Sequence, residues 1–261
     1  MVPPQPTGRN RSGYAGEPMD LHDLSRMLLG AAETHGWEMK AFHRAPDLEL
    51  HLFHRSPRKP ARRIYLSAGI HGDEPAGPLA IADLLQRDDW PPDAELWICP
   101  CLNPTGFQNR TRQNAQGIDL NRDYRSAKAP EVRAHLALLN RLPQFDLTVC
   151  LHEDWESRGF YLYELNPDCQ PTLAEAVVSA VSQVCPIDPS AIIDGRAAET
   201  GIIRPNLDPA SRQDWPEAFY LIQQKTRLSY TLEAPSDFEL PVRVTALTTA
   251  VHAMLGAFVR R

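Results

Sequence analysis

Apolar residues recur along this chain with helical and strand periods that alternate. Residues 19–35 place Leu21, Leu24, Met27, Leu28 and Ala31 on one helical face. Further helices are predicted over residues 76–87, 131–142, 172–185 and about 241–258. Alternating or continuous apolar runs predict strands at 48–55, 64–70, 95–102, 145–152, 160–164 and 228–234.

This alternation predicts an α/β fold: a single domain with a mostly parallel mixed sheet and helices on both faces. The domain is expected to span residues 19–261, after a polar, Pro- and Gly-rich arm at residues 1–18 that is expected to be flexible. Residues 103–130 and 186–214 have no clear period. Loops of such length in compact domains are usually functional or disordered.

Composition narrows the classes of function. The net charge of −6 gives no basic surface for nucleic acid. Five cysteines, an odd number in a long chain, indicate reduced thiols rather than a disulfide framework. No apolar run approaches the roughly 18 residues that a membrane helix needs, and the N-terminus lacks the apolar segment of a secretory signal. We therefore expect a cytoplasmic protein that binds neither nucleic acid nor a membrane.

Three predicted strands end in side chains that can bind a metal or move a proton. His71 and Glu74 follow the strand at 64–70, His152 ends the strand at 145–152, and Glu233 lies at the end of the strand at 228–234. Ligands of open α/β sheets bind beyond the carboxyl ends of the strands. Two imidazoles, one carboxylate and an open fourth position form the ligand set of a catalytic zinc site.

Each of these signals taken alone has an ordinary structural explanation. A turn with His and Glu three residues apart also fits a solvated loop, a lone His at a strand end is more often structural, and Glu233 alone fits an ordinary strand-end carboxylate. Their joint occurrence at strand ends favours the metal site.

A further signal lies in the long loop, in the run RQNAQGIDLNR at 112–122. Arg112, Asn121 and Arg122 offer the planar and amide donors that carboxylates and oxyanions accept. The run therefore predicts an anion-binding pocket, although Asx turns in a polar surface loop would also explain it.

The ordered set of H-x-x-E, Arg, Asn-Arg, His and a late Glu over residues 62–235 resembles the zinc metallocarboxypeptidase family. The run at 112–122 is most similar to the short bacterial murein peptide amidases and to the succinylglutamate desuccinylase/aspartoacylase group. The resemblance implies one zinc ion held by His71, Glu74 and His152. It also implies that Glu233 is the general base, that Arg112 stabilises the oxyanion, and that Asn121 and Arg122 bind the substrate carboxylate.

The resemblance implies a zinc-dependent hydrolase that cleaves an amide next to a free carboxylate, of the carboxypeptidase type on a small peptide. An N-acyl amino acid deacylase and a non-catalytic zinc-binding homologue are the alternatives. The tyrosine of the pancreatic-type members has no assignable counterpart. The acidic run at 153–156 (EDWE) could select a substrate with an amino group, or could orient His152 and cap its loop.

Overall fold

The computed structural model describes residues 4–12, 14, 16–46 and 48–260. Its centre is an eight-stranded mixed sheet in the order β1-β2-β4-β3-β5-β10-β6-β9. The strands are β1 (Glu38–Ala45), β2 (Leu48–Arg55), β3 (Arg62–Ala68), β4 (Ala94–Cys99), β5 (Leu147–Asp154), β6 (Tyr161–Leu165), β9 (Ile202–Ile203) and β10 (Ser229–Pro235). The central strands β4, β3, β5 and β10 run parallel. Strands β1 and β2 pair antiparallel with each other, β2 pairs antiparallel with β4, and β6 pairs antiparallel with β10 but parallel with β9.

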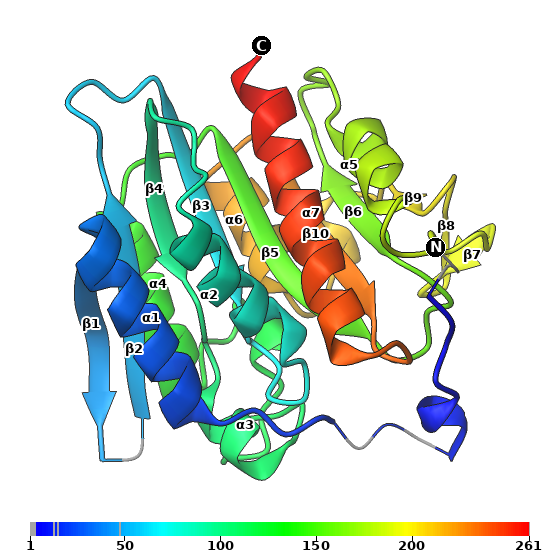
Figure 1. Ribbon diagram of the computed structural model, residues 1–261, viewed down its shortest axis with the longest axis horizontal. Helices are drawn as coiled ribbons and strands as arrows, with labels where there is room; N and C mark the ends of the chain where they lie inside the picture. The colour runs from blue at the N-terminus through cyan, green and yellow to red at the C-terminus, as the bar shows by residue number, and fades with distance from the viewer. Residues whose placement is uncertain (1–3, 13, 15, 47, 261) are drawn as a thin grey trace.

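Helices cover both faces of the sheet, as the alternating pattern predicts (Figure 1). One face packs against α1 (Leu21–His35), α2 (Ala76–Arg87), α5 (Ala174–Val181) and α7 (Leu240–Val259). The other face packs against α4 (Pro130–Arg141) and α6 (Glu217–Gln224). The parallel centre is buried on both sides, which explains the continuous apolar runs of β3 and β5.

Most predicted elements are confirmed to within a few residues, and α2 has the predicted bounds. The predicted strand at 64–70 ends at Ala68, because Gly69 turns the chain with a positive φ of 64°. On the predicted apolar face of α1, Leu24, Leu28 and Ala31 are buried, whereas Met27 is 38% exposed.

The sequence patterns missed several elements. Neither β1 nor α6 was predicted, and β1 lies at the sheet edge with mostly exposed side chains that obscure an alternating pattern. The long polar segment at 103–130 contains α3 (Pro104–Asn109) and the 3-10 turn η2 (Leu120–Arg122). The segment at 186–214 contains the hairpin of β7 (Ile192–Ile193) and β8 (Arg196–Ala197), strand β9, and the turn η3 (Pro209–Ser211).

Helix α7 corrects the expectation about apolar length. It is 20 residues long with a mean hydropathy of 1.5, which is enough by length and composition to cross a membrane. Half of that stretch is buried against the rest of the chain, where α7 packs on α2, α5 and β10 (Figure 1). A core helix with a broad buried face has the same composition as a spanning segment.

The described part of the N-terminal arm, with the short turn η1 (Arg9–Ser12), lies against the body of the domain. Thr7 Oγ1 donates to Asp237 at 2.9 Å, Asn10 donates to the carbonyl of Trp155 at 3.2 Å, and Glu17 pairs with Arg243. Residues 1–3, 13 and 15 of the predicted arm lie outside the described residues.

Candidate active site

The predicted ligands sit where two neighbouring parallel strands end. His71 and Glu74 lie in the turn after β3, and His152 lies near the end of β5, which pairs with β3 in parallel. Gly72 lets this turn press against α3, because a Cβ there would lie 2.0 Å from the backbone carbon of Gly106. The glycine between the two ligands is therefore required by close packing of the backbone.

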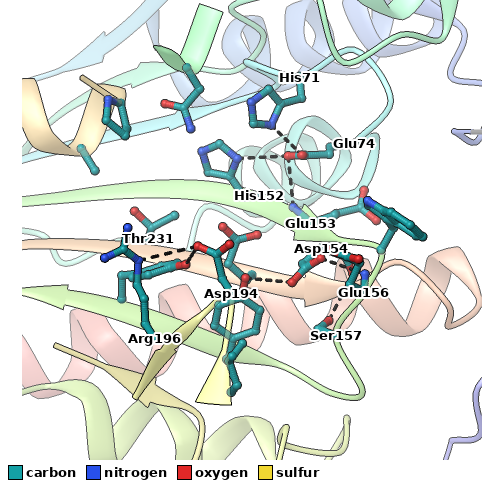
Figure 2. Close-up of a pocket in the computed structure, with 18 of the residues that line it drawn as sticks. His71, Glu74, His152, Glu153, Asp154, Glu156, Ser157, Asp194, Arg196 and Thr231 are labelled. Atoms are coloured by element: carbon teal, nitrogen blue, oxygen red, sulfur yellow. Dashed lines mark hydrogen bonds and ion pairs between the residues drawn. The ribbon is translucent and has the colours of Figure 1, made fainter. Parts of the chain in front are cut away.

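The three side chains converge on one point. Glu74 lies between the two imidazoles, 2.6 Å from His71 Nδ1 through Oε1 and 3.0 Å from His152 Nδ1 through Oε2 (Figure 2). One ligand atom from each residue lies within 4.8 Å of the others, and all three residues are buried. Although burial opposes its charge, the two histidines hold the pKa of Glu74 below its usual value.

This donor set fits a zinc ion. Two imidazole nitrogens and one carboxylate are the protein ligands of many catalytic zinc sites, in which the fourth position stays open. His71, Glu74 and His152 would hold the metal, and the Nδ1 atoms of both histidines already face the shared carboxylate. Burial of a carboxylate beside two imidazoles is costly unless its charge is compensated, and a bound cation would compensate it.

Asp119, which lies in the run at 112–122 and was not predicted as a site residue, also belongs to the site. Its Oδ1 lies 3.3 Å from Nε2 of His71, and its Oδ2 accepts from Nε of Arg112 at 2.9 Å. A carboxylate on the far nitrogen fixes the orientation of a metal-binding imidazole. Despite the opposing effect of burial, His71 and Arg112 hold the pKa of Asp119 below its usual range. The signal was available, because Asp119 is the acidic position of the run at 112–122.

Glu233 lies beside the ligand cluster because β10 pairs in parallel with β5. The register sets Glu233 opposite His152, and its partly buried side chain lines the same cavity. Burial and the negative charge of Glu74 raise the pKa of Glu233 well above its usual value. A carboxylate with a raised pKa binds a proton more tightly than an ordinary one and is suited to accept and return a proton.

The three predicted anion-binding residues line this cavity as well, which has a volume of about 1180 Å³. Arg112 Nη1 lies 3.5 Å from Glu74 Oε1, so the guanidinium borders the ligand cluster. Asn121 and Arg122 lie on η2. The structure thus brings all seven predicted site residues to one cavity, with Asn121 and Arg122 in its wall.

The acidic run after His152 is largely occupied with contacts inside the protein. The carboxylate of Glu153 accepts from the backbone N–H of Ala76 at 2.6 Å and from buried Arg243. Asp154 accepts from the backbone of Glu156 and from Tyr161 (Figure 2). These contacts favour the alternative in which the run caps its loop and supports His152.

Some residues of the cavity wall had no sequence signal. Arg196 lies on β8 and Arg212 follows η3, both in the segment that had no clear period. Burial, together with the positive charges of Arg196 and Arg122, lowers the pKa of Arg212. Three guanidinium groups from distant segments therefore lie near one another at this cavity.

Comparisons with known proteins agree with this geometry. The succinylglutamate desuccinylase/aspartoacylase catalytic domain matches residues 60–195, just over half of the 261 residues. Carboxypeptidase SOL1 of Arabidopsis thaliana is 32% identical over 108 residues, which cover 32% of this chain. The match spans about a fifth (21%) of the length of SOL1.

Two solved structures share the fold. A provisionally named metallopeptidase from Shewanella amazonensis SB2B superposes with a TM-score of 0.79 at 23% identity, over 91% of this chain and 93% of that chain. A metallo-carboxypeptidase from Burkholderia cenocepacia gives a TM-score of 0.67 at 16% identity, over 94% and 71% of the two chains. With the fold, the site and the family match in agreement, the chain belongs to the succinylglutamate desuccinylase/aspartoacylase catalytic domain family and shares the fold of these two structures.

Proposed function

We propose that this protein is a zinc-dependent hydrolase that cleaves an amide bond next to a free carboxylate, in the manner of a carboxypeptidase acting on a small peptide. One observation carries the proposal. His71, Glu74 and His152 converge in a cavity that Glu233 and Arg112 also line. A metal site that only stabilised the fold would have a closed ligand set and no need of a neighbouring carboxylate with a raised pKa.

Each side chain has a distinct role in this proposal. Zinc, when bound, supplies a Lewis acid that polarises the carbonyl and favours ionisation of water. Glu233 takes the proton of the attacking water and returns it to the leaving amine. Arg112 donates hydrogen bonds to the oxyanion that develops on the carbonyl oxygen.

The substrate carboxylate is assigned to Asn121 and Arg122. An arginine can donate two parallel hydrogen bonds to a carboxylate, and an amide N–H₂ adds a third donor. No carboxylate lies within ion-pair distance of Arg122 in the part of the chain that the structure describes, so its charge is available to a ligand. The substrate would thereby be held with its terminal carboxylate next to the scissile amide.

A deacylase of N-acyl amino acids is a second candidate because further arginines surround the proposed carboxylate-binding residues Asn121 and Arg122. Arg212 has a buried Nε without a hydrogen-bond partner and packs 4.6 Å from the ring centre of Phe219. The ion pair of Arg196 with Asp194 is loose, at 3.8 Å. Two cations beside Arg122 suit a small substrate that carries more than one carboxylate, such as an N-acyl derivative of an acidic amino acid.

The general-base assignment is tested with Glu233→Gln, which preserves shape and removes the base. We expect the zinc-loaded variant to keep one equivalent of zinc and to lose at least about 10²-fold in kcat. Thr231→Val, a change in the same strand and cavity wall, serves as a control for packing. Wild-type turnover by Glu233→Gln would show that another group moves the proton.

A substrate panel separates the candidate functions. Peptides that differ only in their last residue, with neutral, acidic or basic side chains, are compared with N-acyl derivatives of the same amino acids. Preference for the peptides supports the carboxypeptidase, and preference for the acyl derivatives supports the deacylase. Absence of hydrolysis of every compound by the zinc-loaded protein would favour the non-catalytic homologue.

We also propose a cytoplasmic location and small-molecule substrates. The five cysteines are unpaired, and three of them, Cys99, Cys150 and Cys185, are buried, which fits a reducing compartment. Cell fractionation with an antibody to the native protein would test the location.

A further inference from the structure

A hydrogen bond to the protein backbone holds the side chain of Asn121 in one orientation in the cavity wall. Its Oδ1 accepts a hydrogen bond from the backbone N–H of Glu217 at 2.8 Å. Because the oxygen is occupied in this way, the N–H₂ end is the donor that remains for a ligand. Glu217 is the first residue of α6, so the position of that helix start determines where the Asn121 amide lies.

The carboxyl group of Glu217 points the other way, into the core, where it is 1% exposed. Its Oε1 accepts from the hydroxyl of Tyr65 at 3.1 Å. Tyr65 Oη lies 2.8 Å from His135 Nε2, and Tyr124 Oη lies 2.6 Å from His135 Nδ1. All four side chains are buried.

When Tyr65 donates to Glu217, one pattern of donors satisfies the rest of this chain. Tyr65 donates to Glu217, so it accepts from a protonated Nε2 of His135, and Nδ1 then accepts from Tyr124. Such an arrangement needs a neutral imidazole, and burial lowers the pKa of His135 to about 3. The network therefore anchors Glu217, and with it the start of α6, to strand β3 and helix α4.

We propose that Glu217 is a positioning residue for substrate binding, which holds Asn121 in the orientation that binds the substrate carboxylate; the inference rests on the proposed function. Glu217 does not touch the substrate. It acts through its own backbone N–H, whose place is set by the buried hydrogen bonds of its side chain.

The groups that face Glu217 make its positioning of Asn121 sensitive to pH. They are neutral side chains from three strands and one turn: Tyr65 and Ser67 on β3, Cys99 on β4, Cys150 on β5, and Tyr124 in the turn after η2. With no cation among them, burial raises the pKa of Glu217 to about 7. Ionisation above that pH places an uncompensated charge in the core and should displace the start of α6.

The raised pKa of Glu217 also determines how the stability of the fold changes with pH. The pKa of Glu217 is raised above the ordinary 4.5 to about 7, so the folded state binds the proton more tightly than the unfolded state. The stabilising contribution of the protonated group is complete below about pH 4.5 and is lost as the pH rises to about 7. Glu217→Gln, which cannot ionise, should lack this loss.

The test uses the zinc-loaded full chain and two substrates, a peptide with a free terminal carboxylate and its carboxamide. Glu217→Ala should raise KM for the carboxylate about 3- to 10-fold, as expected for one hydrogen bond, with kcat and the KM of the carboxamide within about twofold. Glu217→Gln should restore KM at pH 6. The KM of the wild type should rise between pH 6 and 8, and that of Glu217→Gln should not. Equal effects on both substrates, or on kcat, would overturn the proposal.

A spectroscopic measurement separates this inference from the proposed function. The side-chain amide signal of Asn121 in a ¹⁵N spectrum, assigned through Asn121→Asp, should shift with an inflection near pH 7 in the wild type and stay constant in Glu217→Gln. If Arg122→Ala leaves carboxylate binding unchanged, the substrate anchor is wrong, and this signal still decides whether Glu217 controls Asn121. A pH-independent Asn121 signal in the wild type would overturn the coupling.

Discussion

At the scale of single residues, the site depends on a few contacts made by buried polar side chains. Glu74 contacts both candidate histidine ligands, and Asp119 holds His71 from the other side. A metal-binding imidazole needs such a partner to keep its free nitrogen directed at the metal. The cluster is therefore built for a cation before any substrate is present.

The first prediction at this scale concerns metal binding. His152→Ala removes one of three ligands, so we expect the variant to lose zinc under mild chelation that leaves the wild type loaded. Zinc content is measured by atomic absorption after dialysis. His22→Ala, which changes an exposed histidine on α1, is the matched control and should keep its zinc. A full equivalent of zinc in His152→Ala would remove His152 from the ligand set.

At the scale of elements, helix α7 shows how burial of one face stabilises the fold. Leu247, Val251 and Met254 are fully buried against the sheet and its neighbouring helices, and α7 contacts α2, α5 and β10. The chain returns from β10 directly into α7, which covers the strand that carries Glu233. Packing of α7 and the position of the proposed general base are therefore linked.

Leu247→Ala tests how much the packing of α7 contributes to the stability of the fold. We expect a loss of about 2–5 kcal/mol in the free energy of unfolding, from lost transfer energy and a cavity. Denaturant unfolding measures it. Thr245→Ala changes an exposed position on the same helix and should alter stability by less than about 0.5 kcal/mol. Equal stability of the two variants would show that the α7 face is not tightly packed.

At the level of the complete domain, the N-terminal arm and the last helix meet beside the candidate metal site. Arg243 of α7 is 1% exposed and pairs with Glu153 next to His152 and with Glu17 on the arm. Tyr14 of the arm donates to the backbone carbonyl of Asp73 at 2.5 Å, next to Glu74. Arg243 thus joins the arm and α7 to the strand that carries His152, and Tyr14 joins the arm to the turn that carries His71 and Glu74.

Removal of the arm carboxylate should weaken this junction. Glu17→Gln leaves the buried charge of Arg243 with one carboxylate in place of two, so we expect a loss of about 1–3 kcal/mol in stability, the range for a hydrogen bond to a charged group. Thermal unfolding in low and high salt measures it. Arg9→Ala, which breaks an exposed pair of the same Glu17 at 3.4 Å, should change stability by less than about 1 kcal/mol. If both variants behave alike, the Arg243 contact does not stabilise the fold.

The alternation of helices and strands could be predicted from the sequence alone, and so could the positions of His71, Glu74, His152 and Glu233 at strand ends. This is possible because the apolar periods are local, and because the carboxyl ends of parallel strands lie at one edge of a sheet. The motif at 112–122 also predicted that Arg112, Asn121 and Arg122 are part of the same site.

The surroundings of these residues depend on how the chain folds. The tertiary structure placed β3, β5 and β10 side by side, buried Glu217 under Asn121, and gathered Arg196 and Arg212 near Arg122. These contacts join residues far apart in sequence, so they leave no period or spacing in the chain. A polar residue such as Glu217 reads as exposed in a local pattern, and only its partners in the folded core show why it is buried.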